Sequence, residues 1–454
     1  MSDIVNVRIG NIGITITGKT PSSQFPEDFG EDYMFITPSD SFDQKYISTA
    51  ERYLSVEGVE KLKSKLLPAD SLMVTCIGSA MGKVAMNRTA CITNQQINSI
   101  IPSKNFSPDY LYYALKNSYT LLRNAASGST SLPLLNKTDF DNLELSVHFN
   151  KPTQQKIASV LSSLDSKIEL NNRINAELET MAKTLYDYWF VQFDFPNTKG
   201  KPYKISRGEM IWSEELKREI PEGWDVVKMS EWIDNNKSGD WGKEEPEGNF
   251  TKKVICFRGA DINGLNGLDE LKPPVRYILE KNSFKILKSH DLIIEISGGS
   301  PTQSTGRLAF ITDATIKRFD HPLICSNFCK PISIKNKKLL YNFVYYWNSL
   351  YENGIFFGYE GKTSGIKNLL FDSFVSSYYT VVPDEKIVNQ FYDIMESIQE
   401  KKQTALAENQ KLSELRDWLS PMLMNGQVKV KDAEEMVSMA AEIEVGYRKK
   451  KSIS

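Results

Sequence analysis

The fold of this chain is decided by the stretch Lys151-Pro152-Thr153-Gln154-Gln155-Lys156-Ile157, which opens a long apolar stripe. About 230 residues later a second stretch, Pro383-Asp384-Glu385-Lys386-Ile387, opens a matching stripe. Alternating steps of four and three residues, the spacing of one face of a coiled-coil helix, connect the positions of both stripes. The apolar positions are Ile157, Leu161, Leu164, Ile168, Leu178 and Leu185 in the first stripe, and Ile387, Phe391, Ile394, Ile398, Leu412 and Leu415 in the second.

Each stripe predicts one helix of about 35 to 40 residues, which is about 55–60 Å long at 1.5 Å per residue. A proline stands in the first turn of each, where its missing N–H is tolerated. Polar residues that can fix pairing and register interrupt both stripes in the same middle stretch, at Asn171, Asn175, Lys401 and Glu408. We therefore expect an antiparallel coiled coil; the alternative is two unrelated amphipathic surface helices.

The segments that precede the two helices also repeat each other. The expected strand at 254–258 matches the one at 33–38, and the strand at 292–296 matches the one at 72–77. An expected helix at 339–353 matches the one at 109–122. The loops differ, since the second copy is longer between its glycines by Ser300 to Thr305. The sequence thus predicts an α+β fold: two similar mixed α/β domains separated by two long helices, in a pseudo-twofold internal repeat.

The predicted boundaries follow chain order. A chain of 454 residues exceeds what one hydrophobic core usually supports. We expect a first domain over residues 1–150, a central helical spacer over 151–195, a linker over 196–222, a second domain over 223–383, a C-terminal helical spacer over 384–426 and a tail over 427–454.

Composition limits the class of protein. The apolar fraction of 41% and charged fraction of 25% are ordinary for a globular protein. A formal net charge of −2 argues against a wholesale polyanion binder but leaves room for local basic patches. Five scattered cysteines form no disulfide framework, and three histidines complete no zinc pattern. With no signal peptide and no apolar run of membrane-spanning length, a cytoplasmic protein is expected.

One motif matches a nucleotide-binding pattern, but the residues within it and after it argue against that function. Gly13-Ile14-Thr15-Ile16-Thr17-Gly18-Lys19-Thr20 fits the phosphate-loop pattern. Its alternating Ile and Thr favour a strand, and Pro21 and Pro26 disfavour the helix that must follow. No other motif supplies a catalytic set, so we expect no catalysis and no bound metal.

What remains is a set of polar side chains in loops. Asn and Gln suit the adenine edge and Arg and Lys suit guanine, while Lys, Ser and Thr also hold phosphates. The alternative is that they are ordinary turn residues. The candidate DNA-binding residues are Lys19, Thr20, Ser39, Ser79, Lys83, Asn94, Gln95, Gln96, Ser129, Thr130 and Lys137 in the first copy, and Lys237, Trp241, Lys243, Arg258, Ser297, Ser300, Gln303, Thr305, Arg307, Tyr359, Lys362, Thr363 and Lys367 in the second.

Several short motifs, taken in order, resemble one family. They are the Gly78/Gly82 pair after a strand, Thr93-Asn94-Gln95, Gln154-Gln155-Lys156-Ile157, Ile220-Pro221-Glu222-Gly223-Trp224, and the closing stretch from Leu415 to Val428. In this order the chain resembles the specificity subunits of type I restriction–modification systems. The first copy departs from the pattern because it lacks the Gly-Trp opening.

The resemblance implies two target-recognition domains, each of which reads one half of an asymmetric, interrupted double-stranded DNA sequence. It implies that the two helices set the gap and dock two modification subunits, joined by restriction and translocase subunits, in a phage-defence complex. No cofactor is expected in this chain; the partners would bind S-adenosylmethionine, ATP and Mg, methylate adenine at N6 and cleave DNA. Two alternatives are a coiled-coil protein-interaction scaffold without DNA specificity, and a nucleotide-dependent enzyme acting through Gly18-Lys19-Thr20.

Overall fold

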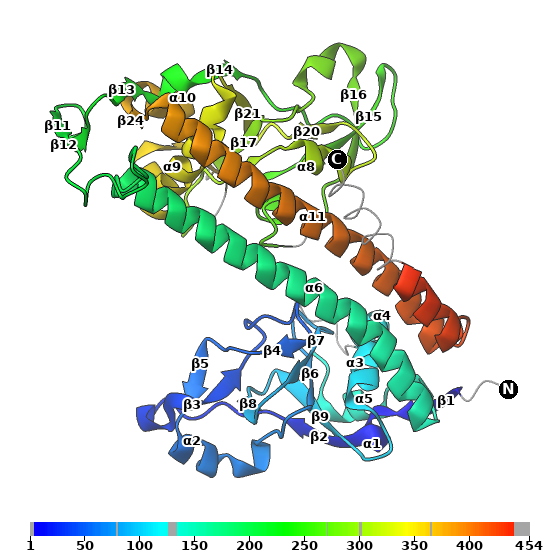
Figure 1. The fold of residues 1–454 in the computed structure, drawn as a ribbon. Coiled ribbons are helices and arrows are strands. Elements are labelled where there is room, and N and C mark those ends of the chain that lie inside the picture. The colour runs from blue at the N-terminus through cyan, green and yellow to red at the C-terminus, as the bar shows by residue number, and fades with distance from the viewer. Residues whose placement is uncertain are drawn as a thin grey trace. The chain divides into compact units, whose positions relative to one another are not determined.

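The structure is a computed structural model that describes residues 4–78, 80–125, 134–269, 271–298, 302–363 and 366–439. The chain forms two compact units: unit 1 is Met1–Glu169 with Asn409–Ser454, and unit 2 is Leu170–Glu408. The long helices α6 (Lys151–Tyr186) and α11 (Glu385–Met424) contribute residues to both units (Figure 1). Their lengths of 36 and 40 residues confirm the two predicted helices.

Unit 1 is built on a five-stranded sheet of order β2-β9-β6-β7-β4, beside a three-stranded sheet of order β5-β3-β8. Its strands are β1 (Ile4–Arg8), β2 (Gly13–Thr17), β3 (Phe29–Ile36), β4 (Tyr46–Ile47), β5 (Arg52–Leu54), β6 (Leu72–Thr75), β7 (Val84–Asn87), β8 (Cys91–Thr93), β9 (Ile97–Pro102) and β10 (Glu144–His148). Its shorter helices are α1 (Ile9–Ile12), η1 (Pro26–Asp28), α2 (Val56–Lys61), η2 (Lys63–Lys65), α3 (Pro108–Asn117), α4 (Tyr119–Asn124) and α5 (Lys137–Asn142). Helix α3 packs on β6 and β7 (Figure 1).

Unit 2 is built on a four-stranded sheet of order β14-β21-β17-β19, beside a three-stranded sheet of order β16-β15-β20. Its strands are β11 (Met210–Ser213), β12 (Arg218–Pro221), β13 (Asp225–Lys228), β14 (Ile233–Asn236), β15 (Phe250–Phe257), β16 (Val275–Leu279), β17 (Leu292–Glu295), β18 (Ser297–Gly298), β19 (Leu308–Phe310), β20 (Leu323–Cys325), β21 (Cys329–Ile334), β22 (Glu360–Thr363), β23 (Ile366–Leu369) and β24 (Tyr379–Val382). Its shorter helices are η3 (Asp187–Val191), η4 (Met229–Trp232), η5 (Gly259–Asp261), α7 (Ile262–Leu265), η6 (Glu280–Lys285), α8 (Asp313–Lys317), η7 (Lys337–Leu339), α9 (Leu340–Glu352), η8 (Ile355–Tyr359) and α10 (Phe371–Ser377).

The two units share one topology, as the repeat predicts. The sheet order β2-β9-β6-β7 corresponds to β14-β21-β17-β19, and β5-β3-β8 corresponds to β16-β15-β20. The two corresponding three-stranded sheets each contain one parallel pair, β3 with β8 and β15 with β20. One local prediction was wrong: the helix expected over 109–122 is two helices, α3 and α4, which meet at Ser118, whereas α9 is continuous.

The chain-order boundaries differ from the compact units in two places. Each unit takes a part of both long helices, which the sequence assigned to separate spacer regions. Residues 196–222, predicted as a linker, contain the antiparallel hairpin of β11 and β12. The tail begins with a helical stretch over 430–439, and its basic end lies outside the described residues. No helix of the described chain is long and apolar enough to cross a membrane.

Within each unit α6 and α11 pair antiparallel. In unit 2 the Asn171 side chain donates to Glu408 Oε2 at 2.8 Å, and Glu179 forms an ion pair with Lys402. In unit 1 Arg416 Nη1 lies 2.9 Å from Asp165 Oδ1. As residue numbers rise on α6, those of their partners on α11 fall, which is the expected antiparallel order.

The stripe on α6 lies where the sequence predicts, with Ile157, Leu161 and Leu164 buried. On α11 the prediction was wrong by one residue between Phe391 and Lys402, whereas Leu412 is buried as predicted. Met395, Gln399 and Lys402 are buried, whereas Ile394 is 39% exposed and Lys401 is exposed. The physical reason is the helical repeat of 3.6 residues, which allows two successive steps of four from Phe391 to Gln399 and so rotates the buried face away from the strict heptad positions.

We predict that Met395→Ala destabilises the protein by about 2–5 kcal/mol, because it leaves a cavity in a fully buried position. Ile394→Ala is the matched control one residue away and should cost about 0.5 kcal/mol, the size of a surface substitution. Urea denaturation followed by circular dichroism measures both. If Ile394→Ala proved the more damaging of the two, the strict heptad pattern would be right after all.

Candidate nucleic-acid interface

In unit 1 the loops that follow four strands meet at one place. After β2, Lys19 N donates to Thr93 O at 2.9 Å, at the end of β8. Asn94 N donates to Ile36 O at the end of β3 at 3.0 Å, and Cys76 N, after β6, donates to Gln96 O at 2.8 Å. Backbone hydrogen bonds therefore hold the turn 94–96 against three neighbouring strands. We call Lys19, Thr20, Asn94, Gln95 and Gln96 the first loop cluster.

Gly18 makes this approach possible. A Cβ atom at residue 18 would lie 2.1 Å from Thr93 O and 2.2 Å from Asn94 O, so no larger residue fits. The glycine that completes the phosphate-loop pattern therefore serves backbone packing. Strand β2 occupies the residues that would have to form the loop, and the next helical element, η1, has only three residues.

The side chains of the first loop cluster divide into supporting and exposed groups. Thr20 Oγ1 donates to Gln95 Oε1 at 2.7 Å, and Asn94 Nδ2 donates to Gln96 Oε1 at 3.2 Å. Gln96 N in turn donates to Asn94 Oδ1 at 3.1 Å. Asn94 is buried and shapes the turn, whereas Lys19 and Gln95 are exposed. Of the five, Lys19 and Gln95 are therefore the best placed to touch a ligand.

The other candidates of the first copy lie outside this cluster. Three of them make short-range contacts of their own: Ser39 Oγ lies 2.7 Å from Thr37 Oγ1, Lys83 pairs with Asp43 at 3.0 Å, and Lys137 pairs with Asp141 at 3.0 Å. Exposed pairs of this kind contribute little stability and can open. Ser79, Ser129 and Thr130 lie outside the described residues.

Unit 2 repeats the same backbone frame. A Cβ atom at Gly239 would lie 2.0 Å from Ser326 O, and Asp240 N donates to Cys325 O at 2.8 Å. Ser326 N donates to Phe257 O, and Ile296 N to Phe328 O. These bonds match those of unit 1 one for one, so the positions of Lys19, Thr20, Gln95 and Gln96 are taken in unit 2 by Asp240, Trp241, Asn327 and Phe328.

The sequence prediction found Trp241 but missed Asn327 and Phe328. Phe328 is 56% exposed, which is unusual for so large an apolar side chain. The signal that could have found it is the alignment of the short strand Cys91–Thr93 with Leu323–Cys325, which places Asn327-Phe328 opposite Gln95-Gln96. We call Asp240, Trp241, Asn327 and Phe328 the second loop cluster.

Trp241 is held in one orientation by a charged neighbour. The Arg276 guanidinium lies 4.0 Å from the centre of the Trp241 ring, and Arg276 Nη1 lies 2.8 Å from Glu244 Oε1. Two further candidates lie nearby in the chain: Lys237, whose backbone N donates to Pro331 O, and Lys243, which pairs with Glu247 at 3.4 Å.

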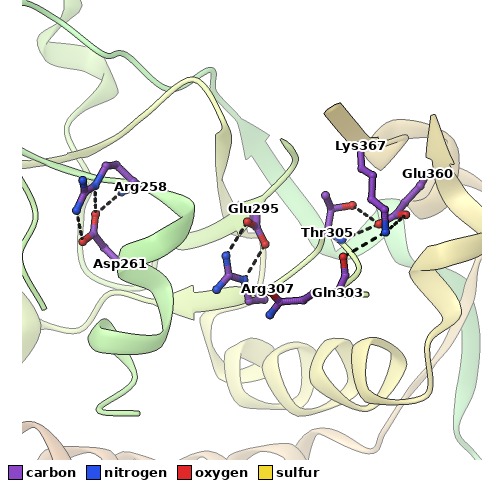
Figure 2. A network of polar contacts seen from close by, with 8 residues as sticks. All are labelled: Arg258, Asp261, Glu295, Gln303, Thr305, Arg307, Glu360 and Lys367. Atoms are coloured by element: carbon purple, nitrogen blue, oxygen red, sulfur yellow. Dashed lines mark hydrogen bonds and ion pairs between the residues drawn. The ribbon is translucent and has the colours of Figure 1, made fainter. Parts of the chain in front are cut away.

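Three predicted cations of unit 2 already have carboxylate partners (Figure 2). Arg307 donates two hydrogen bonds to Glu295, at 2.8 and 2.7 Å, and Arg258 donates two to Asp261, at 2.8 and 3.0 Å. Lys367 Nζ lies 3.3 Å from Glu360 Oε2. The hydrogen bonds to Glu295 raise the pKa of Arg307, and those to Asp261 raise the pKa of Arg258, so both stay charged.

The Arg307–Glu295 and Lys367–Glu360 pairs connect separate segments of the chain, whereas Arg258 and Asp261 lie within one turn. Glu360 Oε1 also accepts from the backbone N and the hydroxyl of Thr305, and Lys367 Nζ donates to Gln303 O (Figure 2). Ser297 Oγ donates to Asn368 Oδ1 at 2.6 Å. Tyr359 packs edge-on against Phe374. Lys362 and Thr363 belong to β22, and Ser300 lies outside the described residues.

The buried Glu295–Arg307 pair is specific to unit 2. The backbone bonds Glu295 N to Arg307 O and Gly306 N to Glu295 O match Thr75 N to Lys83 O and Gly82 N to Thr75 O in unit 1. Thr75 and Lys83 thus occupy the equivalent positions. The frame is the same, but the Glu295–Arg307 pair of unit 2 is replaced in unit 1 by the Thr75 hydroxyl and by Lys83, which pairs instead with Asp43.

The described residues hold no group of three or more His, Cys, Asp or Glu side chains that could bind a metal ion. The five cysteines are free and buried, and burial raises the pKa of Cys76 to about 11 and of Cys329 to about 12. Such thiols stay protonated at neutral pH and are poor nucleophiles.

Comparison with known proteins points to one family. Residues 1–180 match the family model described as the type I restriction modification DNA specificity domain. The chain is 26% identical, over 94% of its length and 93% of the relative, to the type I restriction enzyme MjaIX specificity subunit of Methanocaldococcus jannaschii. It is 37% identical, over 37% of each chain, to the HindI specificity subunit of Haemophilus influenzae.

A solved structure shares the fold. The S subunit of a type I restriction–modification system from M. genitalium covers 93% of this chain and 96% of its own length, with a TM-score of 0.56 at 16% identity. The likeness supports the predicted arrangement of two similar domains with two long helices.

We predict that Arg307→Met destabilises unit 2 by about 3–5 kcal/mol, because it leaves the buried Glu295 carboxylate without its partner. The double variant Glu295→Thr with Arg307→Lys, which imports the residues of unit 1, should recover stability to within about 1 kcal/mol of the original. Thermal denaturation of the three proteins measures this. If the double variant lost as much stability as Arg307→Met, the unpaired Glu295 carboxylate would not be the cause of the loss.

Proposed function

This chain belongs to the family of specificity subunits of type I restriction–modification systems. We propose that it selects an asymmetric, bipartite DNA sequence for the modification and restriction subunits of such a system. Each unit reads one half of the target in the major groove through its loop cluster. The chain itself performs no chemistry. The alternative of a scaffold without DNA specificity does not account for the match to a DNA specificity domain.

The observation that supports two separate readers is one backbone frame carrying unlike side chains. The frame places Lys19, Thr20 and Gln95 in unit 1 where it places Asp240, Trp241 and Asn327 in unit 2. A repeated scaffold with the same loop chemistry would read the same bases twice. Different donors, acceptors and apolar surfaces at equivalent positions suit two different half-sites.

The helices suit the tasks of spacing and docking. At about 1.5 Å per residue, the 36 residues of α6 extend about 54 Å, more than the roughly 34 Å of one turn of B-DNA. Two modification subunits bind along α6 and α11 in this proposal, and restriction and translocase subunits join them. The modification subunits bring S-adenosylmethionine and methylate adenine at N6; ATP and Mg serve the restriction subunits.

The experiment that tests this proposal is methylation mapping. The chain is expressed with its modification subunits in cells that lack other adenine methyltransferases, and methylated adenines are mapped across the genome with and without the chain. The proposal expects one bipartite motif that depends on the chain. Methylation of DNA by the purified chain alone would overturn it.

We predict that replacing residues 1–150 with the matching domain of a relative changes one half of the motif and leaves the other half intact, because each loop cluster rests on its own unit. The same methylation mapping reads the result. A change in both halves would refute independent reading.

A second prediction concerns spacing. Adding one heptad to each of α6 and α11 should lengthen the gap between the two halves without altering either, since the added turns keep the buried face in phase. Assembly of the lengthened protein with the modification subunits is the control that shows it is correctly folded. A lengthened protein that assembles but keeps the original gap would show that the helices do not set the spacing.

A further inference from the structure

We propose that Gln95 is the residue through which unit 1 recognises one adenine of its half-site, and that Thr20 is the residue that positions it. This rests on the proposed function and adds to it the base that one side chain reads. The juxtaposition that carries it is an exposed amide at the tip of a rigid turn, with its oxygen already oriented by a neighbouring hydroxyl.

The turn that carries Gln95 is fixed by the backbone. Its first residue, Asn94, is bound to Ile36 O, and its last, Gln96, accepts from Cys76 N. Gly18 packs directly on the carbonyls of Thr93 and Asn94, so the chain after β2 cannot move away independently. Gln95 is the exposed residue between two anchored neighbours. A reader on so rigid a support loses little conformational entropy on binding.

The side chain is oriented as well as exposed. Thr20 Oγ1 donates to Gln95 Oε1 at 2.7 Å, which fixes the plane of the amide. A carbonyl oxygen has two lone pairs, so Oε1 can still accept a second hydrogen bond, and Nε2 keeps its two donors. Adenine presents N6–H as a donor and N7 as an acceptor in the major groove, and a glutamine amide matches that pair. The exposed Lys19 side chain, next to Thr20, is suited to a flanking phosphate.

Unit 2 supplies the contrast. Its equivalent of Thr20 is Trp241, whose ring is occupied by Arg276, and its equivalent of Gln95 is the shorter Asn327. The hydroxyl that orients the amide in unit 1 is therefore missing at the matching position of unit 2. The oriented glutamine is a property of one half of the molecule, so its effect must appear in one half of the target.

The test uses the full chain assembled with its modification subunits. Once the wild-type motif is mapped, each adenine of the motif is replaced in turn by 7-deazaadenine, which lacks the N7 acceptor. Methylation rates are compared in competition. For the wild-type complex, methylation should fall about 2- to 13-fold at one adenine of one half-site, the effect of losing the hydrogen bond to N7 while that to N6 remains. In the Gln95→Leu complex the same replacement should cost nothing further, and all four bases should be accepted there.

Two more variants separate reading from folding. Gln95→Glu replaces the Nε2 donor with an acceptor and should shift the preference at that position from adenine to cytosine, whose N4 amino group donates. Thr20→Val removes the orienting hydroxyl and should give a smaller loss of discrimination at the same adenine. Asn327→Leu in unit 2 must leave discrimination at that adenine unchanged.

The outcomes distinguish this inference from the proposed function. If the wild-type complex methylates no bipartite motif, the proposed function fails. If the motif exists but Gln95→Leu assembles and keeps every preference, or relaxes both halves, only the assignment of Gln95 is overturned.

Discussion

The structure depends above all on the antiparallel pairing of α6 with α11, because both compact units are built partly from each helix. The buried face of this pair is not uniformly apolar. Asn171, Asn175 and Lys402 are each less than about a tenth exposed, and burying such groups is unfavourable unless they are partnered. Glu408 accepts from Asn171, Glu179 pairs with Lys402, and Asn175 Nδ2 lies 3.5 Å from Lys402 O, so these contacts favour one alignment of the helices. Polar burial here fixes register as well as contact.

A second constraint, close contact between backbones, fixes the loops. Gly18 and Gly239 each approach the carbonyl oxygens at the end of a neighbouring strand so closely that a Cβ would have to overlap them. Because backbone atoms make the contact, the frame is independent of the side chains that it presents. The same frame can therefore hold Thr20 and Gln95 in one unit and Trp241 and Asn327 in the other, and specificity can change without a change of fold.

Charge in a loop proved a weak guide to the candidate site. Arg258, Arg307 and Lys367 look alike in sequence to Lys19, yet each has a carboxylate partner. Asp261 is local to Arg258, whereas Glu295 and Glu360 reach Arg307 and Lys367 only when the strands assemble. The strict heptad failed between Phe391 and Lys402 because two successive steps of four residues are also compatible with one buried helical face.

The sequence by itself determined the two long helices, the duplicated strand order and the absence of a phosphate loop at Gly18-Lys19-Thr20, because these follow from local periodicity, β-branched alternation and proline placement. Tertiary structure alone decided which loop residues are exposed. Whether Gln95 meets Thr20, or Arg307 meets Glu295, depends on contacts between residues 75 and 12 positions apart, which the sheet creates. Local propensity acts within a few residues. The pairing of distant strands decides whether a polar side chain in a loop is exposed and oriented or is already bound to a carboxylate partner.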